Sequence, residues 1–216
     1  MKIKSGELED KGYVLLDKLE HKELIPFIKK YIKKRTKFSF FYYFSNFLVF
    51  GFTGYLLMKG FGNPEFDIAA RFTHFCYGLA IAFVLIPLHE YIHVIAYKSQ
   101  GAKNTSYKAN FKKLYFMALA DKFVADKKEF LIVALAPFIV INSVLIVLIF
   151  AVNSDWKLTI CGIMLTHTAM CTGDFGLMSY FEVNKDRQVV TYDDVENKIS
   201  YFWGKTEKNN LNSDKC

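Results

Sequence analysis

The sequence is poor in cysteine, and its four cysteines are not spaced as a redox or metal-binding pair. They are Cys76, Cys161, Cys171 and Cys216. The lack of a C-x-x-C spacing argues against a disulfide framework and against a cysteine-rich zinc site, so we expect mostly buried apolar thiols. The first 30 residues also lack an apolar run followed by a small-residue cleavage site, which argues against a cleaved signal peptide.

Nucleic-acid-binding motifs and internal repeats are missing as well. The net charge of +7 would suit a nucleic-acid partner, but the basic residues gather beside apolar segments, where anionic lipid attracts them. We therefore expect the lipid bilayer as a partner and no nucleic acid. The lack of a repeat argues against a transporter.

Charged residues are scarce within four long apolar segments. These segments are residues 38–58, 73–97, 130–152 and 156–181. Each provides the roughly 17 to 25 residues that a helical span needs. With 52% hydrophobic residues and polar stretches between the segments, the sequence predicts an α-helical membrane protein with about four transmembrane helices and short polar termini.

Lysine and arginine distinguish the two sides of these segments. They are concentrated in residues 29–37 and in the connection 98–129, whereas the connection 59–72 is balanced in charge. Because positive charge marks cytoplasmic loops, we expect a multi-pass chain in a bacterial cell membrane with both termini in the cytoplasm. The expected parts are a basic amphipathic segment over 1–37 with a helix over 22–37, a membrane domain over 38–181 with a cytoplasmic insertion at 98–129, and a cytoplasmic tail over 182–216.

An H-E-x-x-H pattern, formed by His89, Glu90 and His93, lies inside the apolar segment 73–97. On a helix the two histidines share one face, one turn apart, close enough to bind one metal ion. Glu90 points about 100° away around the helix from His89, so it can reach a water on that metal without being a ligand. Zinc peptidases use this arrangement, with the carboxylate as general base. The pattern predicts a Zn²⁺ site, the simpler interpretation being two hydrogen-bonded core histidines.

A catalytic zinc ion usually has three protein ligands, and three residues at membrane depth are candidates for the third. They are His74, His167 and Asp174. If each segment is one helix rising about 1.5 Å per residue, the histidine pair lies about 9 Å from the cytoplasmic end of its span, Asp174 about 10 Å and His167 about 21 Å. Asp174 fits best, and Gly173 and Gly176 allow close helix approach. His167 is expected to line the cavity, polarise a carbonyl or make a structural hydrogen bond.

Two short stretches have the pattern of β-strands. Tyr107, Ala109 and Phe111 alternate with polar residues in the insertion, which predicts a β-hairpin-like element. Residues 189–192 and 199–203 flank a polar turn and predict two further strands. An exposed strand beside the site could bind an extended substrate at its edge, and a hairpin that only caps the helices fits the same pattern.

These residues resemble a known family. The H-E-x-x-H helix, the segment 127–137, the Gly173-Asp174 element and a short polar tail are similar to bacterial membrane proteins described as putative zincin peptidases, and also to intramembrane metalloproteases of the site-two protease type. The resemblance implies Zn²⁺ bound by His89, His93 and Asp174, with Glu90 as general base.

The sequence departs from the site-two protease pattern in two places. Asp174 is followed by Phe175 instead of directly by glycine, and Asn142 lies further from Ala136-Pro137 than the pattern places it. Asn142 therefore has two interpretations, orienting a substrate or making a helix-to-helix hydrogen bond. For Pro137 the favoured interpretation is a kink in the third span.

The sequence thus predicts a zinc metalloprotease that hydrolyses peptide bonds of a peptide or membrane-protein substrate at or near the cytoplasmic leaflet. A non-catalytic zinc-binding membrane protein, structural or chaperone-like, is the first alternative, and substrate turnover that depends on Glu90 distinguishes the two. A metal transporter is the second, and polar groups confined to the inner half of the spans argue against it. Zinc itself is inferred, since other divalent ions take similar ligands.

Overall fold

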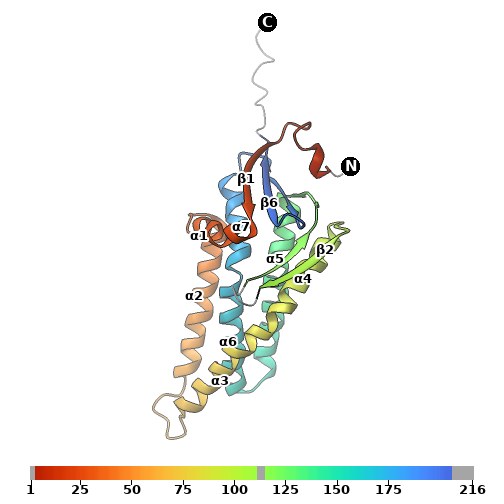
Figure 1. Ribbon diagram of the computed structural model, residues 1–216. Coiled ribbons are helices and arrows are strands. Elements are labelled where there is room, and N and C mark those ends of the chain that lie inside the picture. Colours follow the sequence, from red (N-terminus) through yellow and green to blue (C-terminus); the bar gives the residue numbers. More distant parts are fainter. Residues whose placement is uncertain (1–2, 111–114, 206–216) are drawn as a thin grey trace.

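The helices form an elongated bundle with small β-sheets gathered at one end (Figure 1). The computed structural model describes residues 3–110 and 115–205. Its α-helices are α1 (Leu24–Ile32), α2 (Lys37–Met58), α3 (Ile68–Ala82), α4 (Ile86–Ser99), α5 (Lys127–Ala151), α6 (Ser154–Met170) and α7 (Thr172–Val183). Short 3₁₀ helices are η1 (Ser5–Glu7), η2 (His21–Glu23) and η3 (Phe83–Leu85). The strands are β1 (Val14–Glu20), β2 (Thr105–Asn110), β3 (Tyr115–Ala120), β4 (Ala125–Asp126), β5 (Val190–Asp194) and β6 (Ile199–Gly204).

Among the described residues, three helical segments are long and apolar enough to cross a membrane by length and composition. They are Lys37–Met58, Ile68–Ser99 and Lys127–Ala151. The second segment joins α3, η3 and α4 into one helical rod that crosses the bundle obliquely (Figure 1). These helices coincide with the first three spans predicted from the sequence.

The fourth predicted span, residues 156–181, is not one continuous helix. The helix is interrupted at Cys171, between the end of α6 and the start of α7, and the two helices have 17 and 12 residues. Neither therefore has the length of the three helices above. The assumption of one regular helix over this segment is wrong, and the break lies directly beside Asp174.

The β-strands include those that were predicted and two more, β1 and β4. β2 and β3 pair antiparallel, which confirms the hairpin-like insertion, although Phe111 of the predicted strand lies outside the described residues. The larger sheet has the order β1-β6-β5-β4, and its strands β5 and β6 are those predicted in the tail. β1 was not predicted, and it joins the N-terminal segment to the tail. α1 is shorter than the helix predicted over 22–37.

An aromatic cluster holds α1, α7 and the larger sheet together. The ring of Tyr180 on α7 lies 5.1 Å from Phe27 and 4.9 Å from Tyr31, both on α1, between ring centroids. Phe202 on β6 lies 4.8 Å from the same ring. The Tyr180 hydroxyl donates to Asp17 on β1 at 2.7 Å, so its polar end is satisfied within the core. This cluster fixes α7, and with it Asp174, against the rest of the protein.

Two glycines allow α3 and α6 to approach each other closely. A Cβ added to Gly78 would overlap the carbonyl oxygen of Thr159, and one added to Gly162 would meet that of Phe75. The Thr159 hydroxyl donates to the carbonyl oxygen of His74 across the same contact, at 2.9 Å. Small residues let membrane helices pack tightly where lipid supplies no hydrophobic driving force. Because α3 continues into α4, this contact also anchors the helix of the H-E-x-x-H pattern.

Replacement of Gly78 by alanine should destabilise the protein by about 1 to 3 kcal/mol, because overpacking forces the two helices apart. Gly54→Ala on α2 is the matched control, since a Cβ there meets no described atom within 4 Å. It should be neutral or stabilise by up to about 1 kcal/mol, because alanine is the better helix former. Thermal unfolding in detergent measures both variants, and equal stability would contradict the close approach.

Candidate metal centre

The two histidines of the H-E-x-x-H pattern project from one side of α4. His89 and His93 are both buried, and their Nε2 atoms lie 3.1 Å apart. Side chains four residues apart share a helix face, so the local sequence is sufficient to produce this pair.

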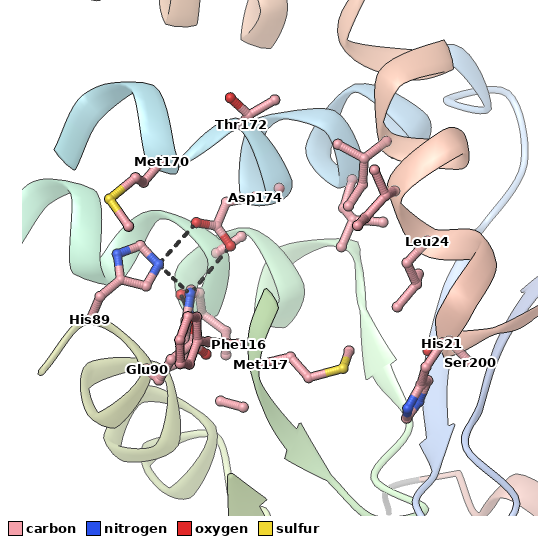
Figure 2. A pocket seen from close by; sticks show the side chains of 18 of the residues that line it. His21, Leu24, His89, Glu90, Phe116, Met117, Met170, Thr172, Asp174 and Ser200 are labelled. Atoms are coloured by element: carbon pink, nitrogen blue, oxygen red, sulfur yellow. Dashed lines mark hydrogen bonds and ion pairs between the residues drawn. The ribbon is translucent and has the colours of Figure 1, made fainter. Parts of the chain in front are cut away.

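Asp174, in the first turn of α7, completes the cluster. Its Oδ2 lies 3.4 Å from Nε2 of His89, and its Oδ1 lies 3.2 Å from Nε2 of His93 (Figure 2). One nitrogen from each histidine and a carboxylate oxygen all lie within 4.8 Å of one another. The structure thus brings together the three residues that the sequence analysis assigned as ligands.

The orientation of His93 is set by α5. Its Nδ1 lies 2.9 Å from the carbonyl oxygen of Val133, and since a carbonyl only accepts, Nδ1 carries the proton and donates. That carbonyl is available because Pro137, four residues further along α5, has no N–H to donate to it. A neutral His93 therefore turns the lone pair of Nε2 toward Asp174. The interpretation of Pro137 as a simple kink misses this role.

His89 is held by a third histidine. Its Nδ1 lies 3.2 Å from Nε2 of His167 on α6, so its second nitrogen is engaged outside the cluster while Nε2 points into it. At about 21 Å from the end of its predicted span, His167 was expected to lie much deeper than the histidine pair at about 9 Å. That placement assumed a regular helix through residues 156–181, and the break at Cys171 invalidates the rise per residue on which it rested. Of the expected roles, lining the cavity and a structural hydrogen bond are the ones observed.

Contacts from α1 and α2 support the first turn of α7. The hydroxyl of Tyr42 on α2 donates to the carbonyl oxygen of Ala169 at 3.0 Å, beside the helix break. A Cβ added to Gly176 would lie 2.7 Å from Cγ2 of Ile28, so glycine is needed for α1 to pack against α7 here. Gly176 therefore acts as predicted, by allowing close approach, whereas a Cβ added to Gly173 would come no nearer than 4.0 Å to Ile28.

The cluster opens into a cavity of about 500 Å³ that Glu90 also lines. Glu90 is buried, and a backbone hydrogen bond from Ala118 on β3 reaches its carboxylate. Its Oε2 has no hydrogen-bond partner among the described residues. Glu90 thus stands beside the ligand cluster with one carboxylate oxygen available, as its offset around the helix predicts.

The donor set fits a divalent cation. Because Nδ1 of His93 already donates to Val133, a neutral His93 places a lone pair 3.2 Å from Oδ1 of Asp174. Two acceptor atoms at this distance repel each other unless a metal cation lies between them or Nε2 of His93 is also protonated and donates to Asp174. Two imidazole nitrogens and a carboxylate oxygen are ligands that Zn²⁺ takes, and a catalytic zinc with three protein ligands keeps one position open.

A second group of ligand-type atoms overlaps the first. It consists of His89, His167 and Cys171, whose Sγ lies 4.0 Å from Nε2 of His167. Cys171 is fully buried and is not among the cavity-lining residues of the described chain. This group therefore suits an enclosed structural ion, whereas the group with Asp174 faces the cavity and Glu90.

The other candidates of the sequence analysis lie away from the cluster. His74 hydrogen-bonds to Thr159 at the opposite end of α3, with 3.2 Å between Nδ1 and the hydroxyl oxygen. Asn142 donates to the carbonyl oxygen of Phe138 in its own helix at 2.8 Å, so neither interpretation given above describes that contact. In the described part of the chain neither residue lines the cavity.

A family model described as "Putative zincin peptidase" matches residues 82–186. This segment is just under half of the chain and carries the whole cluster, from α4 through the hairpin and α5 to α7. The chain is therefore similar to a family of zinc metallopeptidases over the part that forms the site. No curated protein and no solved structure matches the chain.

Replacement of Pro137 by alanine should weaken zinc binding by about tenfold, because the new N–H competes with His93 for the carbonyl of Val133. The same change removes a proline from a helix interior, so the thermal midpoint should stay the same or rise. Competition with a chromophoric chelator measures the affinity, with Pro64→Ala in the exposed connection between α2 and α3 as control. Unchanged zinc affinity in a folded Pro137→Ala protein would contradict the role assigned to the proline.

Metal analysis of purified variants separates the two candidate groups. We expect roughly one zinc ion per chain in the natural protein and in Cys171→Ser, and loss of most of it in His89→Ala and Asp174→Ala. The converse result, zinc lost from Cys171→Ser and kept by Asp174→Ala, assigns the ion to the enclosed group. Equal zinc in every variant would discard both groups.

Proposed function

We propose that this protein is a multi-pass bacterial membrane zinc metalloprotease that cleaves a membrane-associated peptide or protein near the cytoplasmic leaflet. The observation that carries the proposal is the free Oε2 of Glu90, buried in the same cavity as the cluster of His89, His93 and Asp174 and without a partner among the described residues. Burying a carboxylate oxygen without a hydrogen-bond partner costs free energy. Such an oxygen is therefore expected to interact with a molecule that binds in the cavity.

The chain would hold the ion through His89, His93 and Asp174. When bound, Zn²⁺ supplies a Lewis acid that polarises the scissile carbonyl and makes water acidic near neutral pH. Glu90 then accepts the proton of the attacking water at Oε2 and passes it to the leaving amine. The backbone N–H of Ala118 keeps the other side of this carboxylate oriented.

The hairpin supplies a surface for an extended substrate. β3 pairs with β2 along one edge, while Phe116, Met117 and Ala118 of β3 line the cavity. A peptide added beside β3 would be held extended, with its backbone next to Glu90 and the metal ligands. This supports the predicted substrate-binding strand over a hairpin that only caps the bundle.

The location near the cytoplasmic leaflet rests on charge. The lysine-rich insertion and the basic segment before α2 belong to the end of the bundle that carries the sheets (Figure 1). Residues of α1 and of the strands at this end also line the cavity. Positive charge of this kind marks the cytoplasmic side. A metal cluster built from a histidine pair and a later aspartate beside glycine also supports the likeness to site-two proteases.

A non-catalytic zinc protein is the rival proposal, and the enclosed group with Cys171 is the observation that favours it. It does not account for the cavity or for the unpartnered oxygen of Glu90 in the described structure. Both features are expected of a protein that admits a substrate.

The substitution Glu90→Gln should lower peptide cleavage by at least about 100-fold while zinc content and the thermal midpoint remain those of the natural protein. Synthetic single-span peptides reconstituted with the purified protein serve as substrates, and mass spectrometry identifies the products. Glu65→Gln, at an exposed glutamate of the outer loop, is the matched control and should cleave normally. Full cleavage by Glu90→Gln overturns the mechanism, and zinc binding without any Glu90-dependent cleavage favours the non-catalytic protein.

A further inference from the structure

The cavity continues well beyond the cluster of His89, His93 and Asp174, to the face of the larger sheet. Its far end is lined by polar residues that the proposed hydrolysis does not use: His21, Thr191, Asp193 and Ser200. Figure 2 shows His21 and Ser200 on the opposite side of the cavity from His89, with Met117 between them.

The pairing of the sheet explains why these polar residues share one face. Ser200 on β6 lies opposite Leu19 on β1 and opposite Asp193 on β5. Two residues further along β6, Phe202 lies opposite Thr191 on β5. Directly opposed residues, and residues two apart on a strand, point to the same side of a sheet. The face of the sheet that carries Leu19 and Phe202 therefore also carries Ser200, Asp193 and Thr191, and burying these polar groups costs free energy that apolar side chains would not cost.

His21 is the clearest sign that this end receives a ligand. It follows β1, its side chain is 94% buried as its exposed fraction is 6%, and its backbone N–H donates to the carbonyl oxygen of Lys198. Neither Nδ1 nor Nε2 has a hydrogen-bond partner among the described residues. Burial, helped by the nearby Lys108 and Lys198, lowers its pKa, so the ring is neutral and presents one donor and one acceptor nitrogen.

Asp193 supplies negative charge at the same end. Its Oδ1 accepts a hydrogen bond from the Ser200 hydroxyl at 2.6 Å. Burial, with a smaller contribution from Asp121, raises its pKa to about 6, although Ser200 and Lys108 oppose this. The ammonium of Lys108 donates to the carbonyl oxygen of Val195 at 2.9 Å. Asp193 is thus a desolvated carboxylate without a full counter-charge, and a bound cation would stabilise its charged form.

The polar end lies within reach of the metal cluster. Tyr97 on α4 also lines the cavity, and Asp193, Asp174 and Glu90 all lie near enough to its hydroxyl to disfavour its ionisation. A peptide held beside β3 at the cluster can therefore extend one long side chain to the sheet.

We propose that the sheet end of the cavity is a specificity subsite that binds a lysine or arginine side chain of the substrate, contacted by Asp193 and His21. The inference rests on the proposed function and names its substrate class. A cationic donor satisfies both the carboxylate and the acceptor nitrogen of His21. An acidic side chain would be repelled by the charge of Asp193, and an apolar one would leave His21 without a hydrogen-bond partner and Asp193 without a bound cation.

The test uses acetylated single-span peptides that differ at one position, which carries lysine, norleucine, glutamine or glutamate in turn. The position is moved along the peptide to find the one that reaches the subsite. The natural protein should prefer lysine over norleucine by about tenfold in kcat/KM. Asp193→Asn and His21→Phe should lose this preference while norleucine peptides are cleaved within about twofold of the natural rate. Asp186→Asn, at an exposed aspartate, is the matched control and should keep it.

Binding separates failure of the subsite from failure of the proposed function. Fluorescently labelled lysine and norleucine peptides are titrated into the Glu90→Gln protein, alone and combined with Asp193→Asn. About tenfold tighter binding of lysine that disappears with Asp193→Asn supports the subsite even if no peptide is cleaved. Glu90-dependent cleavage without any lysine preference, or a preference for glutamine or glutamate, overturns the subsite and leaves the protease standing.

A stability measurement shows that Asp193→Asn acts on charge and not on folding. A carboxyl group whose pKa is raised by folding takes up protons in the folded state, so stability falls as pH rises between about 4 and 6. As pH rises over this range, the thermal midpoint of the natural protein should therefore fall relative to that of Asp193→Asn. A variant that is less stable than the natural protein at every pH would assign Asp193 a merely structural role.

Discussion

The site depends on one constraint, that the outer nitrogens of both histidines are engaged elsewhere so that their inner nitrogens face Asp174. The carbonyl oxygen of Val133 accepts a hydrogen bond from Nδ1 of His93, and Nε2 of His167 contacts Nδ1 of His89. Helix α5 contributes the first partner and α6 the second, while α7 brings the carboxylate. Helices α4, α5, α6 and α7 together direct two histidine nitrogens and a carboxylate oxygen toward one point, where a bound cation would stabilise the arrangement.

The local parts of this design could be predicted, because they depend on short-range periodicity. Spacing alone places His89 and His93 on one helix face, and alternation alone places the hairpin and the strands β5 and β6. What could not be predicted depends on contacts between distant segments. No proline near Cys171 predicts the helix break there. The free carbonyl oxygen of Val133 becomes important only when α5 packs against α4 and brings His93 to it. β1 was missed because its partner lies near the other end of the sequence.

The division between an apolar bundle and a polar sheet gives the cavity two different ends. One end is built on helices and holds the candidate metal ligands, and the other is built on strands and presents His21 and Asp193. Rigid elements frame both ends, with the aromatic cluster around Tyr180 joining helix to sheet. Chemistry and recognition are therefore proposed to lie on separate structural units, so that one can vary while the other is kept.

The pairing of β1 with β6 also bears on how the protein matures. β1 leaves the ribosome early, yet its partner strand is made only after every helix of the bundle, so the sheet wall of the cavity forms last. Closing so large a loop costs conformational entropy that the earlier helix contacts have by then largely offset. A nascent chain would accordingly have its histidine pair before the cavity is closed. In a protease of the kind proposed above, this order would delay peptide cleavage until synthesis is nearly finished.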